Sequence, residues 1–216
     1  MAVFNFDQAD DYVQEKSSIN FFKLQDNGWQ AKVRFMYGPG EVFQGYSVHN
    51  IGTDRNKFVP CLKELGQPLD VCPLCKAGIP VMVQFFIPLY VISISKCING
   101  VMQPEEEVNQ VMVFQRGKQF QGSLASAIRQ CKGTPLVNNV FNIVRNGKAG
   151  DTGTTYVLEH FSTDGTTLDM LPERPEVYGS YVLPDWKYED MIQHLNGAGA
   201  VAQSMITPRQ VSGKVF

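Results

Sequence analysis

The sequence lacks any apolar run long enough to cross a bilayer, although 44% of its 216 residues are hydrophobic. A spanning helix needs about 20 consecutive apolar residues, and the most apolar stretch, residues 79–98, is interrupted by two prolines and by polar side chains. The first fifteen residues contain no lysine or arginine, so a secretory signal with a basic start is not expected. We therefore expect a chain without a membrane partner.

The sequence also has little net charge, because its 19 basic residues nearly balance 21 acidic ones. That balance hides two zones of opposite character. Residues 108–150 contain six lysines and arginines and no aspartate or glutamate, whereas residues 159–190 contain eight acidic residues against two basic ones. A basic zone is the electrostatic footprint expected for phosphate binding, although a solvated surface that happens to lack acids would have the same composition.

Cysteine is scarce, and its placement argues against a disulfide framework. Three of the five cysteines fall within residues 61–75, which favours a reducing compartment. Together with one histidine they form the pattern His49-x11-Cys61-x10-Cys72-Pro-Leu-Cys75. Zinc prefers four tetrahedral nitrogen and sulfur ligands, and four protein ligands leave no open coordination position. The pattern therefore predicts one structural Zn²⁺ that holds a loop-rich segment together.

The Cys72-x2-Cys75 pair is the firmest part of this pattern, because two intervening residues suit two thiols on one metal. A redox role for the pair would need a thioredoxin-like βαβ context, which the flanking residues do not provide. The longer spacers leave an alternative open, in which His49 is a surface residue at a strand end and Cys61 is a buried thiol. The remaining cysteines are expected to be core or surface thiols: Cys97 and Cys131.

Alternating and β-branched segments predict a mainly β protein with short helices. Strands are expected at residues 29–37, 42–51, 81–96, 111–120, 140–145 and 154–161. A helix is expected at residues 122–131, and a shorter one is expected to start at Pro184 and end at about Leu195. This order of strands, helix and closing hairpin favours an OB-fold, a Greek-key β-barrel, although a small sandwich would have the same number of strands.

These elements divide the chain into three parts. We expect an N-terminal arm at residues 1–20, an OB-fold core at residues 21–190 and a flexible C-terminal tail at residues 191–216. The metal-held segment is expected as an insertion in the core at about residues 52–80, where short stretches are separated by proline and glycine.

The ligand order resembles that of the gene-32-type single-stranded DNA-binding proteins of tailed bacteriophages. In that family a strand ending in histidine, one cysteine and a Cys-Pro-x-Cys turn hold a structural zinc subdomain inserted in an OB-fold core. The resemblance implies that His49, Cys61, Cys72 and Cys75 bind one structural Zn²⁺. It covers about residues 20–190, and its specificity lies in the order of these ligands.

The resemblance also implies a function and a setting. Members of the family coat and protect single-stranded DNA during phage DNA replication, recombination and repair, in the cytoplasm of the infected bacterial host, and work with phage replication and recombination proteins. Two features differ. The family has a basic motif near its N-terminus, which only Lys16-Ser17-Ser18 echoes here, and an acidic C-terminal tail, whereas the last five residues here contain no acid.

A binder of single strands without sequence preference needs cations for phosphates and flat aromatic faces for bases. Alternation along the first strand puts Ala31, Val33 and Phe35 on one face and the basic side chains on the other. Each aromatic taken alone is more often a core residue than a contact. The candidate DNA contacts are Lys32, Arg34, Tyr37, Tyr46, Arg55, Lys57, Arg116, Lys118, Phe120, Arg145, Lys148 and Tyr156.

Other functions fit the sequence less well. An HNH-type nuclease needs free and metal-binding histidines beyond the three that the chain contains, His49, His160 and His194. Zinc deaminases need a His-x-Glu motif, whereas His49 is followed by asparagine and isoleucine. A zinc-stabilised structural or transcription-adaptor protein would keep the metal without binding strands, and this alternative stays open. We expect no catalytic residues and no enzymatic activity.

Overall fold

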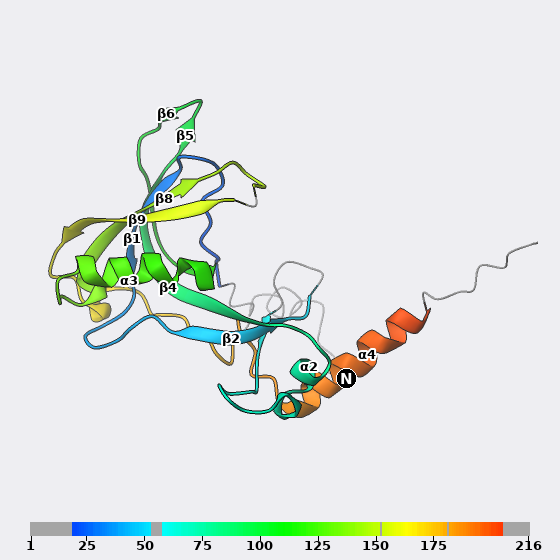
Figure 1. Cartoon of the computed structure of the whole chain (residues 1–216). Helices are drawn as coiled ribbons and strands as arrows, with labels where there is room; N and C mark the ends of the chain where they lie inside the picture. Colours follow the sequence, from blue (N-terminus) through cyan, green and yellow to red (C-terminus); the bar gives the residue numbers. More distant parts are fainter. Residues whose placement is uncertain (1–18, 53–57, 152, 181, 205–216) are drawn as a thin grey trace, which may run out of the picture. The chain divides into compact units, whose positions relative to one another are not determined.

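The computed structural model describes residues 19–52, 58–151, 153–180 and 182–204 (Figure 1). It divides the chain into two compact units, each formed by two separate segments. The first unit combines Met1–Gly45 with Phe85–Pro175, and the second combines Tyr46–Gln84 with Glu176–Phe216. The expected N-terminal arm up to residue 18, the candidate contacts Arg55 and Lys57, and residues 205–216 lie outside the described residues.

The first unit is built on an antiparallel sheet, as the alternating segments predict. Strand β1 lies between β4 and β8, β9 follows β8, and β7 pairs with β4. Within the described residues no pairing joins β7 to β9, so the sheet is open and the expected barrel is not confirmed. Its strands are β1 (Gln30–Phe35), β4 (Val81–Ser95), β7 (Glu106–Gly117), β8 (Asn139–Asn146) and β9 (Thr155–Thr163), with a separate ribbon of β5 (Cys97–Ile98) and β6 (Val101–Met102).

One face of this sheet carries an apolar core. Ala31 and Val33 of β1 lie opposite Ile143 and Phe141 of β8, and all four are buried. Phe35 completes the row, with its ring centroid 5.1 Å from that of Phe141. The alternation expected for the first strand is therefore confirmed for its apolar face, because residues two apart in a strand point to the same side.

Helix α3 (Gln121–Gln130) packs against β9 of the first unit, as expected for residues 122–131. It follows β7 through a short 3₁₀ turn, η3 (Lys118–Phe120). The strand expected at residues 111–120 therefore ends earlier, at Gly117, and begins earlier, at Glu106. Among the described residues, two other short 3₁₀ turns belong to the first unit: η4 (Leu136–Asn138) and η5 (Leu168–Met170).

The second unit consists of short elements and one longer helix. Strand β2 (Gly45–Asn50) pairs antiparallel with β3 (Phe58–Pro60), and the next elements are η2 (Leu69–Val71) and α2 (Pro73–Lys76). Helix α4 (Tyr188–Ser204) also belongs to this unit. The short helix expected to end at about Leu195 is thus longer, and it occupies part of the expected tail. Among the described residues, no helix combines the length and the apolarity that crossing a membrane requires.

Candidate metal centre and candidate nucleic-acid contacts

Four side chains of the second unit converge as the sequence pattern predicts. The ligand atoms of His49, Cys61, Cys72 and Cys75 all lie within 4.8 Å of one another. His49 comes from β2, Cys61 follows β3, and the other two cysteines flank the start of α2. A group of one imidazole and three thiols at this spacing can hold a metal ion.

The local backbone explains why these side chains meet. His49 lies opposite Val59 in the β2–β3 pair, and the N–H of Cys61 extends the pairing by donating to the carbonyl of Ser47 at 2.8 Å. This register places the imidazole and the first thiol on the same face of the strand pair, because Cys61 is two residues beyond Val59, the partner of His49.

A tight turn supplies the other two thiols. The N–H of Lys76 donates to the carbonyl of Cys72 at 3.0 Å, and the N–H of Gly78 donates to that of Cys75 at 3.0 Å. Gly78 has a φ of +79°, a left-handed conformation that glycine adopts without steric cost. The turn places the sulfur atoms of Cys72 and Cys75 beside the imidazole of His49.

The distances within the cluster match those of a tetrahedral metal site. The Sγ atoms of Cys61 and Cys75 are 3.5 Å apart, and Nε2 of His49 is 3.4 Å from Sγ of Cys72 and 3.6 Å from Sγ of Cys75. With zinc–ligand bonds of about 2.3 Å for sulfur and about 2.0 Å for nitrogen, tetrahedral angles give roughly 3.8 Å between sulfurs and roughly 3.5 Å between nitrogen and sulfur. The described cysteines are all free, and a disulfide would need a much shorter S–S distance, about 2.05 Å.

Burial keeps the imidazole in the form that a metal needs. His49 is fully buried, and burial lowers its pKa, an effect that the nearby backbone of Pro80 and Ile79 partly offsets. A neutral imidazole is the form that binds metal through one nitrogen. The other nitrogen, Nδ1, is buried and has no hydrogen-bond partner of normal geometry among the described residues.

The three thiols cannot all ionise next to one another without a cation. Burial and the neighbouring thiols raise the pKa of Cys75 to about 12, and burial also raises the pKa of Cys61. Burial acts in the same direction on Cys72, but hydrogen bonds from the backbone of Cys75, Leu62 and Leu74 outweigh it and lower the pKa of Cys72. A bound divalent cation would stabilise all three thiolates, because a coordinating thiol is deprotonated outright.

The cluster is also the centre of the second unit's small core. Val59, Leu74 and Met191 are buried around the cysteines. Met191 comes from α4, and its Sδ lies 3.7 Å from Sγ of Cys72. We did not expect this contact from the sequence, because an isolated methionine in a helix of mixed polarity carries no signal that it packs beside a distant thiol.

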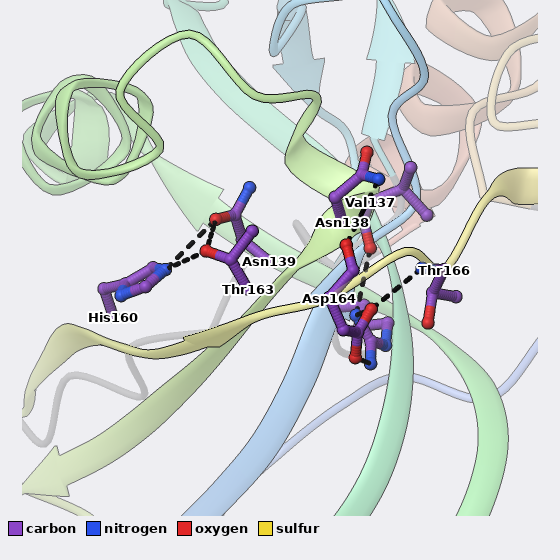
Figure 2. Close-up of polar contacts among 8 residues, drawn as sticks. Val137, Asn138, Asn139, His160, Thr163, Asp164 and Thr166 are labelled. Atoms are coloured by element: carbon purple, nitrogen blue, oxygen red, sulfur yellow. Dashed lines mark hydrogen bonds and ion pairs between the residues drawn. The ribbon is translucent and has the colours of Figure 1, made fainter.

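Two of the candidate DNA-contacting arginines are used inside the first unit. Arg34 is 8% exposed, forms an ion pair with Asp164 and donates to the carbonyl of Val137 at 3.2 Å. Asp164 is itself held by the N–H of Thr166 at 2.8 Å (Figure 2). Arg34 does point away from the apolar face, as expected, but the segment after β9 covers its guanidinium.

Arg145 is similarly enclosed. It is 4% exposed and donates to three backbone carbonyls, those of Leu24 at 2.7 Å, Lys148 at 2.8 Å and Gly147 at 3.0 Å. These bonds hold the turn after β8. A guanidinium with so many internal acceptors is suited to fixing backbone rather than to contacting a strand.

Arg116 is placed differently, against two aromatic rings that contact each other edge to face. Its guanidinium carbon lies 3.7 Å from the ring centroid of Tyr156 and 4.1 Å from that of Phe114. The hydroxyl of Tyr156 is 3.5 Å from Nη1 of Arg145, so the structure brings these three candidates together. Burial lowers the pKa of Arg116, an effect that Tyr156 opposes through its charge and a hydrogen bond and to which the charge of Arg145 adds.

The other candidate contacts differ in exposure. Lys118 and Lys148 are exposed in the first unit, and Lys32 is half-buried there. Tyr46 is half-buried on β2 of the second unit. Tyr37 and Phe120 are buried, at 7% and 6% exposure, so their rings belong to the apolar core, as the general preference of aromatics suggests.

The two histidines outside the cluster have other contacts. Nε2 of His160 lies 3.0 Å from the side-chain oxygen of Asn139 and 2.9 Å from the hydroxyl of Thr163 (Figure 2). The ring of His194 packs against that of Trp186, with centroids 5.5 Å apart. Neither histidine belongs to the metal-ligating group.

Comparison with known proteins identifies no relative of this chain. The chain matches no protein-family model, no curated protein and no solved structure.

Proposed function

We propose that this protein binds single-stranded DNA without sequence preference, and that it coats and protects such DNA during phage replication, recombination and repair. One observation carries the proposal. The guanidinium of Arg116 lies against the rings of both Tyr156 and Phe114, and Arg116 belongs to a stretch of sequence that contains no acidic residue from 108 to 150. Among the described residues, no carboxylate forms an ion pair with Arg116, and its Nε atom is buried without a hydrogen-bond partner.

A guanidinium without a carboxylate partner is suited to an anionic ligand. Phosphate is the anion that arginine forks recognise, and the half-buried ring of Tyr156 beside the cation is an aromatic surface against which an unpaired base can stack. The exposed side chains of Lys118 and Lys148 extend the positive charge within the same unit. Stacking and phosphate contacts tolerate any base, which is why we propose binding without sequence preference.

The metal cluster supports a structural part of the proposal. We propose that the metal is Zn²⁺, because three thiolates and one imidazole form a closed set of the kind that zinc prefers. A closed set gives the metal no position for substrate, so its role is to hold the second unit. We also propose that the first unit is an OB-type core that accepts the strand.

Binding to oligonucleotides at two salt concentrations tests the function. We expect a single-stranded oligonucleotide to bind more tightly than a duplex, and different base compositions to bind with similar affinity. The slope of log K against log salt should flatten by about 0.7 in Arg116→Ala, because one phosphate contact is lost. Lys187→Ala is the matched control, because Lys187 is an exposed cation paired with Asp185 in the second unit.

Two results would contradict the proposal. Tight binding to one duplex sequence would indicate sequence readout, and no binding to any oligonucleotide would favour the zinc-stabilised adaptor. An unchanged slope in Arg116→Ala with intact strand binding would show that the phosphate contacts lie elsewhere in the chain.

A further inference from the structure

The face of the first unit's sheet opposite the apolar core contains a small polar groove of about 150 Å³. It is formed by side chains from β1, β4, β8 and β9 and by one side chain from the residue before β7. The residues that matter for its chemistry are Gln30, Lys32, Ser93, Glu105, Asn142 and Phe161.

Strand register explains why these side chains share a face. Lys32 of β1 lies opposite Ser93 of β4 on one side and opposite Asn142 of β8 on the other. Directly paired residues of neighbouring strands point to the same side of a sheet, so the three form a row across it. The amide of Asn142 donates to the side-chain oxygen of Gln30 at 3.0 Å, which fixes the amide at the edge of the row.

Phe161 is an exposed aromatic in this polar setting. The β8–β9 register shifts between Val140 and Phe141, so that Phe141 lies opposite His160 and Val140 opposite Ser162, which leaves Phe161 as the unpaired residue of a bulge. Bulges re-aim a side chain at sites of function. Phe161 is 58% exposed, and Nζ of Lys32 lies 4.4 Å from its ring centroid.

The cation of the groove, Lys32, is already paired with the carboxylate of Glu105. One carboxylate oxygen of Glu105 lies 2.5 Å from Nζ of Lys32, and the other accepts a hydrogen bond from Ser93 at 3.0 Å. The hydrogen bond from Lys32 lowers the pKa of Glu105, so the carboxylate is charged at neutral pH. Glu105 thus holds the positions that two phosphate oxygens could take, one on the ammonium and one on the hydroxyl.

We propose that this groove binds one nucleotide of a single strand, with its base against Phe161 and its phosphate on Lys32, and that Glu105 is a built-in competitor that the phosphate displaces. The inference rests on the proposed function and deepens it by adding Phe161, Ser93 and Asn142 to the contacts. The side chains of Lys32 and Glu105 are 27% and 45% exposed, so the pair is a weak, solvent-screened one that a ligand can exchange.

If the phosphate displaces the carboxylate of Glu105, removing that charge should increase the affinity for a single strand. Replacing Glu105 by glutamine keeps a hydrogen-bond acceptor for Ser93 but removes the competing charge. We expect Glu105→Gln to bind a thymine oligonucleotide about threefold to fivefold more tightly, which is the range of an exposed ion pair. The salt slope should steepen by about 0.7. In the free variant, solution counterions instead of a carboxylate neutralise Lys32, and these counterions are released on binding.

A neighbouring ion pair offers a matched control. Glu106 is the next residue along the chain and pairs with Lys96 at 2.6 Å, so Glu106→Gln changes the net charge equally and also frees a lysine. The base contact is tested by Phe161→Ala, which should weaken binding at least fivefold through lost stacking, and by Phe161→Leu, which keeps an apolar side chain without the aromatic face. Phe161 is exposed, so both variants should fold.

Fluorescence anisotropy with a labelled thymine oligonucleotide, at several salt concentrations, measures all five proteins. Tighter binding by Glu105→Gln alone, with weaker binding by both Phe161 variants, supports the groove. Equal gains in affinity in Glu105→Gln and Glu106→Gln would show that only the net charge matters, and would contradict the groove proposal. Affinities equal to that of the unmodified protein in all four variants would contradict it as well. If the unmodified protein binds no oligonucleotide, the proposed function fails as well, so the two failures are distinguishable.

Discussion

The two units of the chain reach stability by different means. The first unit buries large aromatic side chains such as Phe35, Phe114 and Phe141 within and beside its sheet. The buried core around the metal cluster of the second unit is small, with Val59, Leu74 and Met191 packed around two of the thiols. Apolar burial can hold a sheet of this size, whereas short elements with little apolar area need another source of free energy. We propose that metal–ligand bonds provide it in the second unit.

Removing the metal should have the largest effect and should act on one unit only. We expect the purified protein to hold about one equivalent of zinc by metal analysis. Chelation, or the double variant Cys72→Ser, Cys75→Ser, should unfold the second unit, because structural zinc contributes on the order of 10 kcal/mol of apparent binding free energy. Hydrogen exchange should show faster exchange at residues 58–80 and in α4, with the first unit unchanged.

Cys97→Ser is the control for this experiment, because Cys97 lies in the first unit and outside the ligand group. It should retain the metal and the exchange pattern. If residues 58–80 of the metal-free protein keep their protection from hydrogen exchange, the small apolar core is enough to fold the second unit, and the proposed difference between the units is wrong.

A core substitution in the first unit should give the converse result. Phe141 is fully buried, so Phe141→Ala should lower the free energy of unfolding of the first unit by about 3–5 kcal/mol through lost burial and the cavity left behind. Denaturant unfolding measures the loss, and metal analysis should still give one equivalent. Phe161→Ala removes the same ring from an exposed position and should change the unfolding free energy little. Loss of zinc from Phe141→Ala would show that the units are not independent.

Met191 tests whether α4 belongs to the metal-held unit. It is fully buried beside Cys72, and Met191→Ala should destabilise the second unit by about 2–5 kcal/mol. We expect a chelator to extract the metal faster from this variant, as measured by a zinc-sensitive dye. The neighbouring Ile192 is 38% exposed, so Ile192→Ala is the matched control. Identical extraction rates in the two variants would show that α4 does not support the cluster.

The metal ligands and most strands could be predicted from the sequence because their signals are local. Ligand type and order suffice to select His49 and the three cysteines, and alternation suffices to assign the apolar face of β1. Residues 81–96 are rich in β-branched and aromatic side chains and contain Pro88 near the middle, which disfavours a helix, and β4 matches the expected range closely.

The surroundings of the charged residues could not be predicted in the same way. Arg34 is covered by Asp164, which lies 130 residues away in the chain, and Arg145 bonds to a carbonyl 121 residues away. Basic residues read from a sequence look free, and only the tertiary structure shows which have internal partners. Phe161 was missed for a related reason, because a register shift between two strands decides where its ring points.

The smallest expected effect concerns pH and the Arg34–Asp164 pair of the first unit. The hydrogen bond from Arg34 lowers the pKa of Asp164 from its ordinary value of 3.8 to about 2. A carboxyl with a depressed pKa in the folded state stabilises it above the unfolded pKa and loses this contribution as the pH falls through the folded pKa. Stability of the first unit should therefore decline between about pH 4 and pH 2. Because the Asp164 side chain is 45% exposed, we expect the pair to contribute at most about 1 kcal/mol.

Acid also protonates the metal ligands, so this test needs a probe confined to the first unit. Trp29 lies in the first unit and Trp186 in the second, so the fluorescence of a Trp186→Phe protein reports on the first unit alone. In that background, Asp164→Asn should lower the free energy of unfolding at pH 6 but not at pH 2, where the carboxyl is already protonated in part. Glu173→Gln changes an exposed carboxyl in the same unit and serves as the control. An equal loss in Asp164→Asn at both pH values would assign its effect to packing, and the first unit would then be held by its apolar core without a measurable charge contribution.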